Sequence, residues 1–418
     1  MSHICTVTLA EPVPQRLSGE LAKRVFFISE AIEDFALEGI GEGPDKALTT
    51  VRLTTTVPMS PELLAGKLDR MIAADILPQR HVRPHVVWRS SHSGTPHTKV
   101  FDELLARGVV TASGEGQFSF TDPFTGLMDH LDKLVRDIAS SLLPLREHNY
   151  PTLIPTHVLA RSGYLRSFPQ LLLFVERLHG DLDTYEAFLD GVADRTDGAD
   201  SARAVADALT NHGTHSGYTL SPAVCYHAYQ QHTGTALAEP LLTLSARGTC
   251  YRHESRYHHS LERLWEFTMR EIILIGSQEA VAEQRRVLME SIFALIDDLG
   301  LEAHCEAASD PFFCSPGTAQ KVWSQRLLEL KYELVLPVGD NSSVAAASFN
   351  VHGQTLAEAF DITAADGTIA ATGCMAFGLE RLAYAFLCRH GVDPEGWPDE
   401  VAHAVSGAPG AVVPGGKR

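Results

Sequence analysis

One short segment, residues 250–271, constrains the fold more than any other part of the chain. It reads CYRHESRYHHSLERLWEFTMRE and is dense in charged and aromatic side chains. Alternate side chains of a strand point to one face, so Arg252 would lie beside Glu254, and Phe267 beside Glu271 on a second strand. Two such strands joined by a charged loop could grip a phosphate with the arginine and stack the phenylalanine on a base. A surface hairpin with a cross-strand Arg–Glu pair would explain the same pattern.

A second signal lies near the end of the chain, in the segment GCMAFGLERLAYAF. Gly373 and Gly378 precede an expected helix with Arg381 in its first turn, an arrangement that brings backbone and guanidinium close to a nucleotide. Together, the two segments resemble motifs 2 and 3 of the class II aminoacyl-tRNA synthetases. The expected helix at 126–147, which leads to Pro155, resembles motif 1, the usual dimer-forming element. The resemblance implies an α+β fold, with an antiparallel sheet flanked by helices, and a homodimer formed near Pro155.

Six segments narrow the resemblance to one subfamily: SFPQLL at 167–172, SPAVCYHAY at 221–229, RHES at 252–255, KYEL at 331–334, SFNVH at 348–352 and TGCMAFGLER at 372–381. They are similar to the amino acid:[carrier protein] ligases, truncated relatives of the atypical seryl-tRNA synthetase of methanogens. The similarity spans about residues 100–395. It implies ATP-dependent activation of a small amino acid (Gly, Ala or Ser) as aminoacyl-AMP. Transfer to the phosphopantetheine thiol of a carrier protein would follow.

The resemblance also implies a zinc site. In this subfamily a cysteine, a glutamate and a second cysteine hold Zn²⁺, and the matching residues here are Cys225, Glu271 and Cys374. Two thiolates and one carboxylate leave a fourth tetrahedral position open, which the α-amine of the substrate can fill. A lone cysteine is more often a small buried hydrophobe, and the other cysteines of the chain are interpreted in that way.

The remaining site roles are carried over from matching motif positions. The resemblance implies that Arg252 binds the α-phosphate, that Glu254 contacts adenine or the motif 2 loop, and that Phe267 stacks under adenine opposite Arg381, which also reaches the γ-phosphate. Ser348 and Asn350 would form the amino-acid pocket, with Lys331 and Glu333 contributing to substrate or nucleotide binding. Class II synthetases commonly place an acid that helps to hold Mg²⁺ shortly before the Ser/Asn strand. Residues 344–347 offer none, so Mg²⁺ is expected with ATP but without this ligand.

The chain is expected to divide into a small α/β domain at 1–98, the catalytic domain at 99–395 and a disordered tail at 396–418. The catalytic domain should contain an acidic helical insert at about 181–210. Within the first domain, helical spacing predicts a helix over 16–37, and HVVWRS at 85–90 predicts a closing strand. Within the second, AEAFDIT at 357–363 predicts a strand.

The charge balance of the chain bears on which molecule accepts the activated amino acid. The chain has 34 Lys and Arg against 52 Asp and Glu, a formal net charge of −18. Binding to tRNA draws much of its affinity from phosphate neutralisation, so this balance favours a carrier protein over tRNA. One acid-free stretch, 76–101, is basic through Arg80, Arg83, Arg89 and Lys99. The α/β pattern of residues 1–98 resembles the tRNA-binding domain of the methanogen-type enzymes, so a seryl-tRNA synthetase-like transfer to tRNA is the alternative.

The expected location is the cytoplasm. Seven scattered cysteines do not suggest a disulfide framework, which points to a reducing compartment. The first residues lack the basic start and apolar core of a signal peptide. No apolar run approaches the roughly 20 residues of a membrane span, so no membrane partner is expected.

Overall fold

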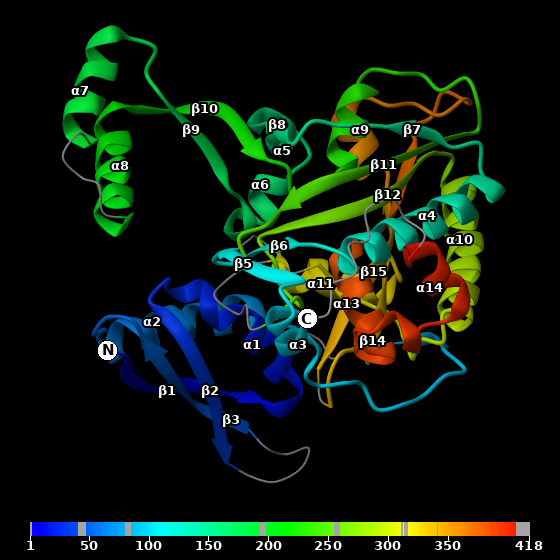
Figure 1. Ribbon diagram of the computed structural model, residues 1–418. Coiled ribbons are helices and arrows are strands. Elements are labelled where there is room, and N and C mark those ends of the chain that lie inside the picture. The colour runs from blue at the N-terminus through cyan, green and yellow to red at the C-terminus, as the bar shows by residue number, and fades with distance from the viewer. Residues whose placement is uncertain are drawn as a thin grey trace, which may run out of the picture.

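An eight-stranded sheet forms the centre of the computed structural model, which describes residues 2–40, 47–79, 85–192, 198–254, 260–310, 312, 317–340 and 342–406 (Figure 1). Every neighbouring pair of strands is antiparallel except β7 and β11. In spatial order the strands are β4 (Val86–Arg89), β13 (His304–Ala307), β14 (Lys331–Pro337), β15 (Ser343–Gly353), β16 (Ala371–Gly378), β12 (Glu266–Gly276), β11 (Leu241–Tyr251) and β7 (Arg146–His148). The predicted α+β class, with a largely antiparallel sheet flanked by helices, is confirmed.

Side chains alternate along these strands, so each strand contributes to two layers. On β12, Ile272 and Leu274 belong to the larger hydrophobic core, which they share with α4 (Phe124–Leu142), α10 (Gln278–Asp298) and α13 (Leu379–His390). Met269 and Glu271 of the same strand turn to the opposite face, where they line a cavity. The three helices therefore support the sheet from behind, and the candidate site lies on its other face.

The helix after Gly378 forms as expected. α13 begins directly after β16, and its predicted apolar residues Leu379, Leu382, Ala383, Phe386 and Leu387 are all buried. The predicted helix at 126–147 is shorter, because α4 ends at Leu142 and residues 146–148 form β7, parallel to β11.

The N-terminal unit, β1 to α2, has a sheet and a core of its own. Its strand order is β1-β3-β2, and its elements are β1 (His3–Pro14), α1 (Ser18–Val25), β2 (Ile32–Ile40), β3 (Ala47–Thr55) and α2 (Pro61–Met71). The sequence prediction of one helix over 16–37 is wrong in its second half. α1 ends at Val25, and β2 pairs with β3 along its length, because strand pairing there outweighs the helical spacing.

The strand expected to close the N-terminal unit is present but belongs elsewhere. β4 pairs with β13, so it extends the large sheet at one edge. It lies before residue 98, where the boundary between the domains was expected. Trp88 of β4 stacks on Phe293 of α10 with ring centroids 4.5 Å apart, which fixes this edge strand to the larger hydrophobic core.

A helical arm stands out from the body (Figure 1). It consists of α7 (Leu182–Val192) and α8 (Gly198–His212), carried on β9 (Phe174–Leu178) and β10 (Gly213–Leu220). The arm occupies the segment expected to be an acidic helical insert. Leu182 and Leu189 of α7 are 68% and 60% exposed.

Two further sequence expectations are wrong. Residues 357–363 were expected to form a strand, but α12 (Thr355–Phe360) forms there, because Leu356, Ala357 and Phe360 are buried at helical spacing. Residues 396–418 were expected to form a disordered tail, but α14 (Asp399–Ser406) forms within this segment, packs on α4 and buries Val401 and Val405. Residues 407–418, the rest of that tail, lie outside the described residues.

The other elements are α3 (Val100–Ala106), β5 (Val110–Gly114), β6 (Gln117–Phe120), β8 (Leu153–Pro155), α5 (Thr156–Arg161), α6 (Tyr164–Ser167), α9 (Cys225–Gln231) and α11 (Thr318–Leu327). Among the described residues, no helix has both the length and the apolar character needed to cross a bilayer.

Candidate active site

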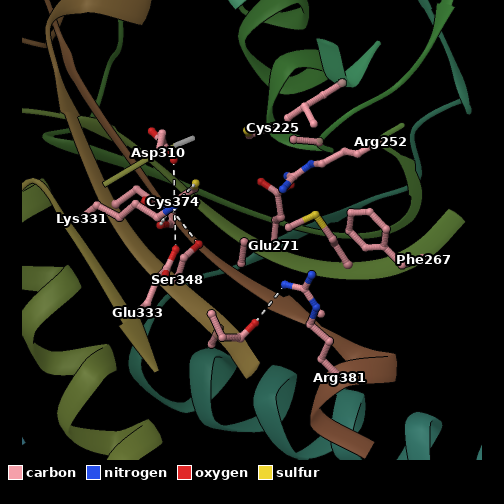
Figure 2. A pocket seen from close by; sticks show the side chains of 18 of the residues that line it. Cys225, Arg252, Phe267, Glu271, Asp310, Lys331, Glu333, Ser348, Cys374 and Arg381 are labelled. Carbon is pink, nitrogen blue, oxygen red and sulfur yellow. Dashed lines mark hydrogen bonds and ion pairs between the residues drawn. The ribbon is translucent and has the colours of Figure 1, made fainter. Parts of the chain in front are cut away.

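A cavity of about 220 Å³ opens on the face of the large sheet that the three core helices leave free. Every residue proposed from the sequence lines it: Cys225, Arg252, Glu254, Phe267, Glu271, Lys331, Glu333, Ser348, Asn350, Cys374 and Arg381. Figure 2 shows Lys331 and Glu333 on one side of the cavity, Arg252, Phe267 and Arg381 on the other, and Glu271 between them. Residues separated by more than a hundred positions are thus brought together by the sheet.

Three of these residues form a potential metal site. Cys225 is the first residue of α9, Glu271 lies on β12 and Cys374 lies on β16. Their donor atoms lie within 4.8 Å of one another, and all three residues are buried. The backbone N–H of Val224 donates to Oε1 of Glu271 at 2.7 Å. Oε2 is buried and has no hydrogen-bond partner among the described residues.

The pKa shifts of Cys225, Glu271 and Cys374 are compatible with a site that binds a cation. Burial raises the pKa of Glu271 to about 7, helped by the nearby Cys374. A hydrogen bond between the two thiols lowers the pKa of Cys374, assisted by His352 and Asn350, and raises that of Cys225. A metal ion would use the orphaned carboxylate oxygen and offset the repulsion among three groups that bind metals as anions. The residues present therefore fit a metal ion with two sulfur ligands and one oxygen ligand.

The arginine side of the cavity is built from the ends of β11 and β16. β11 ends at Tyr251, so Arg252 and Glu254 lie just beyond the strand, and residues 255–259 of the connecting loop are outside the described residues. Nε of Arg252 donates to the carbonyl oxygen of Pro222 at 3.0 Å, and its guanidinium carbon lies 5.4 Å from the centroid of the Phe267 ring. This side of the cavity thus presents a half-buried cation against an aromatic ring.

Glu254 and Arg381 face the same region. Burial would raise the pKa of Glu254, but Arg263, Arg381 and Arg252 together lower it. Arg263 donates to the Glu254 carboxylate at 2.8 Å. Arg381, in the first turn of α13, donates to the carbonyl oxygens of Glu262 at 2.8 Å and Ala345 at 3.3 Å. Guanidinium groups from both strand ends therefore converge where an anionic ligand would sit.

The opposite side is formed by β14 and β15. Lys331 lies opposite Asn350 in the strand register, and Glu333 opposite Ser348. Nδ2 of Asn350 donates to Oγ of Ser348 at 3.1 Å and approaches Sγ of Cys374 at 3.5 Å. The amide therefore links the polar strand pair to the potential metal ligands.

Sequence reasoning missed two residues here. Asp310 accepts a hydrogen bond from Nζ of Lys331 at 2.7 Å, and Glu333 accepts one at 2.9 Å, so the lysine is held between two carboxylates. His352 follows Ser348 and Asn350 at the same two-residue spacing on β15, and its Nε2 lies 3.9 Å from Sγ of Cys374. The alternation could have identified His352. Nothing in the sequence around Asp310 marks it.

Known proteins with similar sequences include ligases of the predicted kind. No protein-family model matches the chain. A protein of Bradyrhizobium diazoefficiens called amino acid–[acyl-carrier-protein] ligase 1 is 32% identical over 322 residues, which is 74% of this chain and 93% of that protein. The chain belongs to this ligase family. A second ligase of that organism is 34% identical over 294 residues, covering 67% of this chain and 84% of its own length.

More distant relatives of the chain are seryl-tRNA synthetases. The type-2 serine–tRNA ligase of Methanococcus aeolicus is 28% identical over 71% of this chain, but the match covers 57% of that protein. A crystal structure of M. kandleri SerRS, a seryl-tRNA synthetase, in complex with A. aeolicus tRNASec superposes with a TM-score of 0.68 at 20% identity, over 97% of this chain and 96% of that one. The Pyrococcus horikoshii seryl-tRNA synthetase complexed with ATP gives 0.57 at 13% identity, over 83% and 78%. The fold is therefore that of the class II synthetases, as the motifs predicted.

Proposed function

We propose that the protein activates a small amino acid (Gly, Ala or Ser) with ATP and transfers it from aminoacyl-AMP to the phosphopantetheine thiol of a carrier protein. The observation that carries the proposal is membership of the ligase family over most of each relative's length. The convergence of every candidate residue on one cavity supports it.

The arginine side is assigned to ATP. In the first step a carboxylate oxygen of the amino acid attacks the α-phosphorus, the bond to the β-phosphate breaks, and pyrophosphate leaves. Arg252 would neutralise charge on the α-phosphate, and Arg381 would bind the γ-phosphate. Phe267 would stack under adenine. Glu254 would contact adenine or the loop that follows β11. Mg²⁺ is expected to enter with ATP, as it does for nucleotide substrates in general.

Cys225, Glu271 and Cys374 are assigned to Zn²⁺. Two sulfur donors and one carboxylate oxygen suit this ion, and the unpartnered Oε2 of Glu271 supports its presence. When bound, the ion supplies an open coordination position for a primary α-amine. Ser348, Asn350, Lys331 and Glu333 would then orient the amino acid, because they line the cavity beside these ligands.

Transfer to tRNA is the second candidate. Its support is the superposition on a seryl-tRNA synthetase, which covers 97% of this chain and so includes most of the N-terminal unit. Against it stand the net charge of −18 and the shortage of basic residues. Arg89 and Lys99 of the basic stretch are exposed, whereas Arg80 and Arg83 lie outside the described residues.

A two-stage assay tests the function. The protein should catalyse ATP–pyrophosphate exchange with a small amino acid, and labelled amino acid should then appear on a phosphopantetheinylated carrier protein but not on bulk tRNA. A carrier without the phosphopantetheine arm is the control and should stay unlabelled. Absence of exchange with every amino acid would refute the enzyme assignment. Label on tRNA, lost steeply as salt rises, would refute the carrier assignment.

We also propose a homodimer through α4, β7 and β8, near Pro155. Arg270 joins α4 to β7 by its bonds to Asp132 and Glu147, and the outer side of β7 has no strand partner among the described residues. Leu142, at which α4 ends, and Leu153, at which β8 begins, are 39% and 40% exposed.

Sedimentation should give the mass of two chains for the wild type and of one chain for the double variant Leu142→Asp/Leu153→Asp, because buried carboxylates would oppose association. The control is Leu63→Asp, an equally drastic change at an exposed leucine of α2. A dimer that survives the double change would place the interface elsewhere.

A further inference from the structure

We propose that the N-terminal unit clamps one wall of the amino-acid pocket through Glu20 and Arg24, which act as positioning residues for Asp310 and Lys331. This inference rests on the proposed function, which assigns Lys331 to binding of the amino acid. The evidence for the clamp itself is a set of contacts that runs from α1, through α11 and Phe312, to the cavity.

The outer part of the series joins the two units. Arg24 is 3% exposed, and its guanidinium donates to Oε2 of Glu20 at 2.8 Å and to the carbonyl oxygen of Phe312 at 3.0 Å. Oε1 of Glu20 accepts from Arg326 of α11 at 3.1 Å. One carboxylate of the N-terminal unit is therefore shared by an arginine from each unit.

This ion pair is maintained at neutral pH. Burial would raise the pKa of Glu20, but Lys23, Arg24 and Arg326 lower it to about 2. Glu20 is therefore a carboxylate throughout the pH range in which an enzyme assay is performed. A buried carboxylate with charged partners fixes geometry more firmly than an exposed pair would.

The inner part of the series runs from α11 to the cavity. Gln325, next to Arg326, accepts from the backbone N–H of Asp310 at 2.7 Å and donates to Oδ2 of its carboxylate at 2.8 Å. The other oxygen, Oδ1, accepts from Nζ of Lys331 at 2.7 Å. α11 thus holds the backbone N–H and one carboxylate oxygen of Asp310, and the other oxygen of Asp310 in turn orients the lysine that lines the pocket.

A second connection runs through Phe312. Its carbonyl oxygen is held by Arg24, its N–H donates to the carbonyl oxygen of Asp310 at 2.9 Å, and its ring stacks on Phe168, with the centroids 5.1 Å apart. Phe168 lines the cavity. Both connections therefore reach residues that line the cavity.

The clamp predicts a selective kinetic effect. Asp310 and Lys331 lie on the side of the cavity opposite Arg252, Phe267 and Arg381 (Figure 2). A change at Glu20 or Arg24 should therefore weaken binding of the amino acid and leave binding of ATP nearly unchanged. A general loss of stability would instead reduce the fraction of active enzyme without changing either KM.

The test compares Arg24→Ala, Arg24→Lys and Glu20→Gln in the full chain, with ATP–pyrophosphate exchange as the readout. KM for the amino acid should rise about tenfold in Arg24→Ala and Glu20→Gln, with KM for ATP changed by less than about twofold. Arg24→Lys should fall between Arg24→Ala and the wild type. Lys23→Ala is the matched control, because Lys23 also pairs with Glu20 but is exposed, and this ion pair lies within α1. An unchanged KM for the amino acid in both variants would overturn the clamp.

A second measurement does not depend on activity. Amide hydrogen exchange over residues 317–333 should be faster in Arg24→Ala than in Lys23→Ala. Equal exchange in the two variants would overturn the clamp even in an active enzyme. If the wild type activates no amino acid, the proposed function fails, and the exchange comparison still decides the clamp.

Discussion

Replacing Arg252 with alanine is expected to lower kcat/KM for adenylate formation by about three orders of magnitude, or about 4 kcal/mol of transition-state stabilisation. The guanidinium is fixed by the Pro222 carbonyl and lies against Phe267 inside the cavity, so it needs little reorganisation to meet developing charge. Arg381 is held by different carbonyl oxygens, those of Glu262 and Ala345, so it is not positioned to replace Arg252. The measurement is ATP–pyrophosphate exchange at saturating and limiting ATP.

Arg286→Ala is the matched control, since Arg286 pairs with Glu283 and Glu290 on the exposed face of α10. It should retain wild-type exchange. Arg252→Lys should remain far below wild type, because an ammonium cannot make the two parallel hydrogen bonds of a guanidinium. Full activity in Arg252→Ala would remove this residue from the catalytic assignment.

Changing either proposed metal cysteine to serine is expected to abolish both metal content and adenylate formation. The wild type should contain about one zinc ion per chain, and Cys225→Ser and Cys374→Ser close to none, because a hydroxyl is a far weaker ligand than a thiolate. The removal of one sulfur leaves two donors, fewer than the three protein ligands of a catalytic zinc site. Elemental analysis of the purified variants measures this directly.

Cys5→Ser provides the control, because Cys5 is also buried but lies in the core of the N-terminal unit. It should keep the metal. Glu271→Gln gives a finer comparison, since it retains the shape of the side chain and removes only its charge. Metal at the wild-type level in both cysteine variants would show that the ligands are different residues.

The parts of the site found from sequence are those with short-range signals. Arg252, Phe267 and Glu271 lie in one dense segment, and Arg381 follows a glycine at a strand–helix junction, so local spacing singled them out, and the resemblance to the class II motifs assigned them to a site. Cys225 and Cys374 carry no such signal, and they were assigned through resemblance to a family. Their proximity depends on the pairing of β12 with β16 and on the position of α9, which no local pattern encodes.

The errors have a common physical origin. Residues 32–37 have helical spacing but become part of β2, and residues 357–360 resemble a strand but become part of α12, because tertiary partners decide short segments whose own preferences are weak. Asp310 was missed because its role depends on a lysine and a glutamine from other elements. Sequence reasoning therefore predicted the sheet and the centre of the site better than its walls.

The edge strand β4 has a consequence for the order in which the chain is assembled. Its partner β13 begins at residue 304, and β4 ends at residue 89, so the two strands lie 215 positions apart in the chain (304 − 89). At a synthesis rate of about 5–20 residues per second, β4 leaves the ribosome roughly 10–40 s before β13 does. The N-terminal unit has its own core and can form during that interval, whereas the Trp88 side chain must wait for Phe293. Completion of the large sheet is therefore a late event in biosynthesis, and β4 is the strand that needs protection from other chains until then.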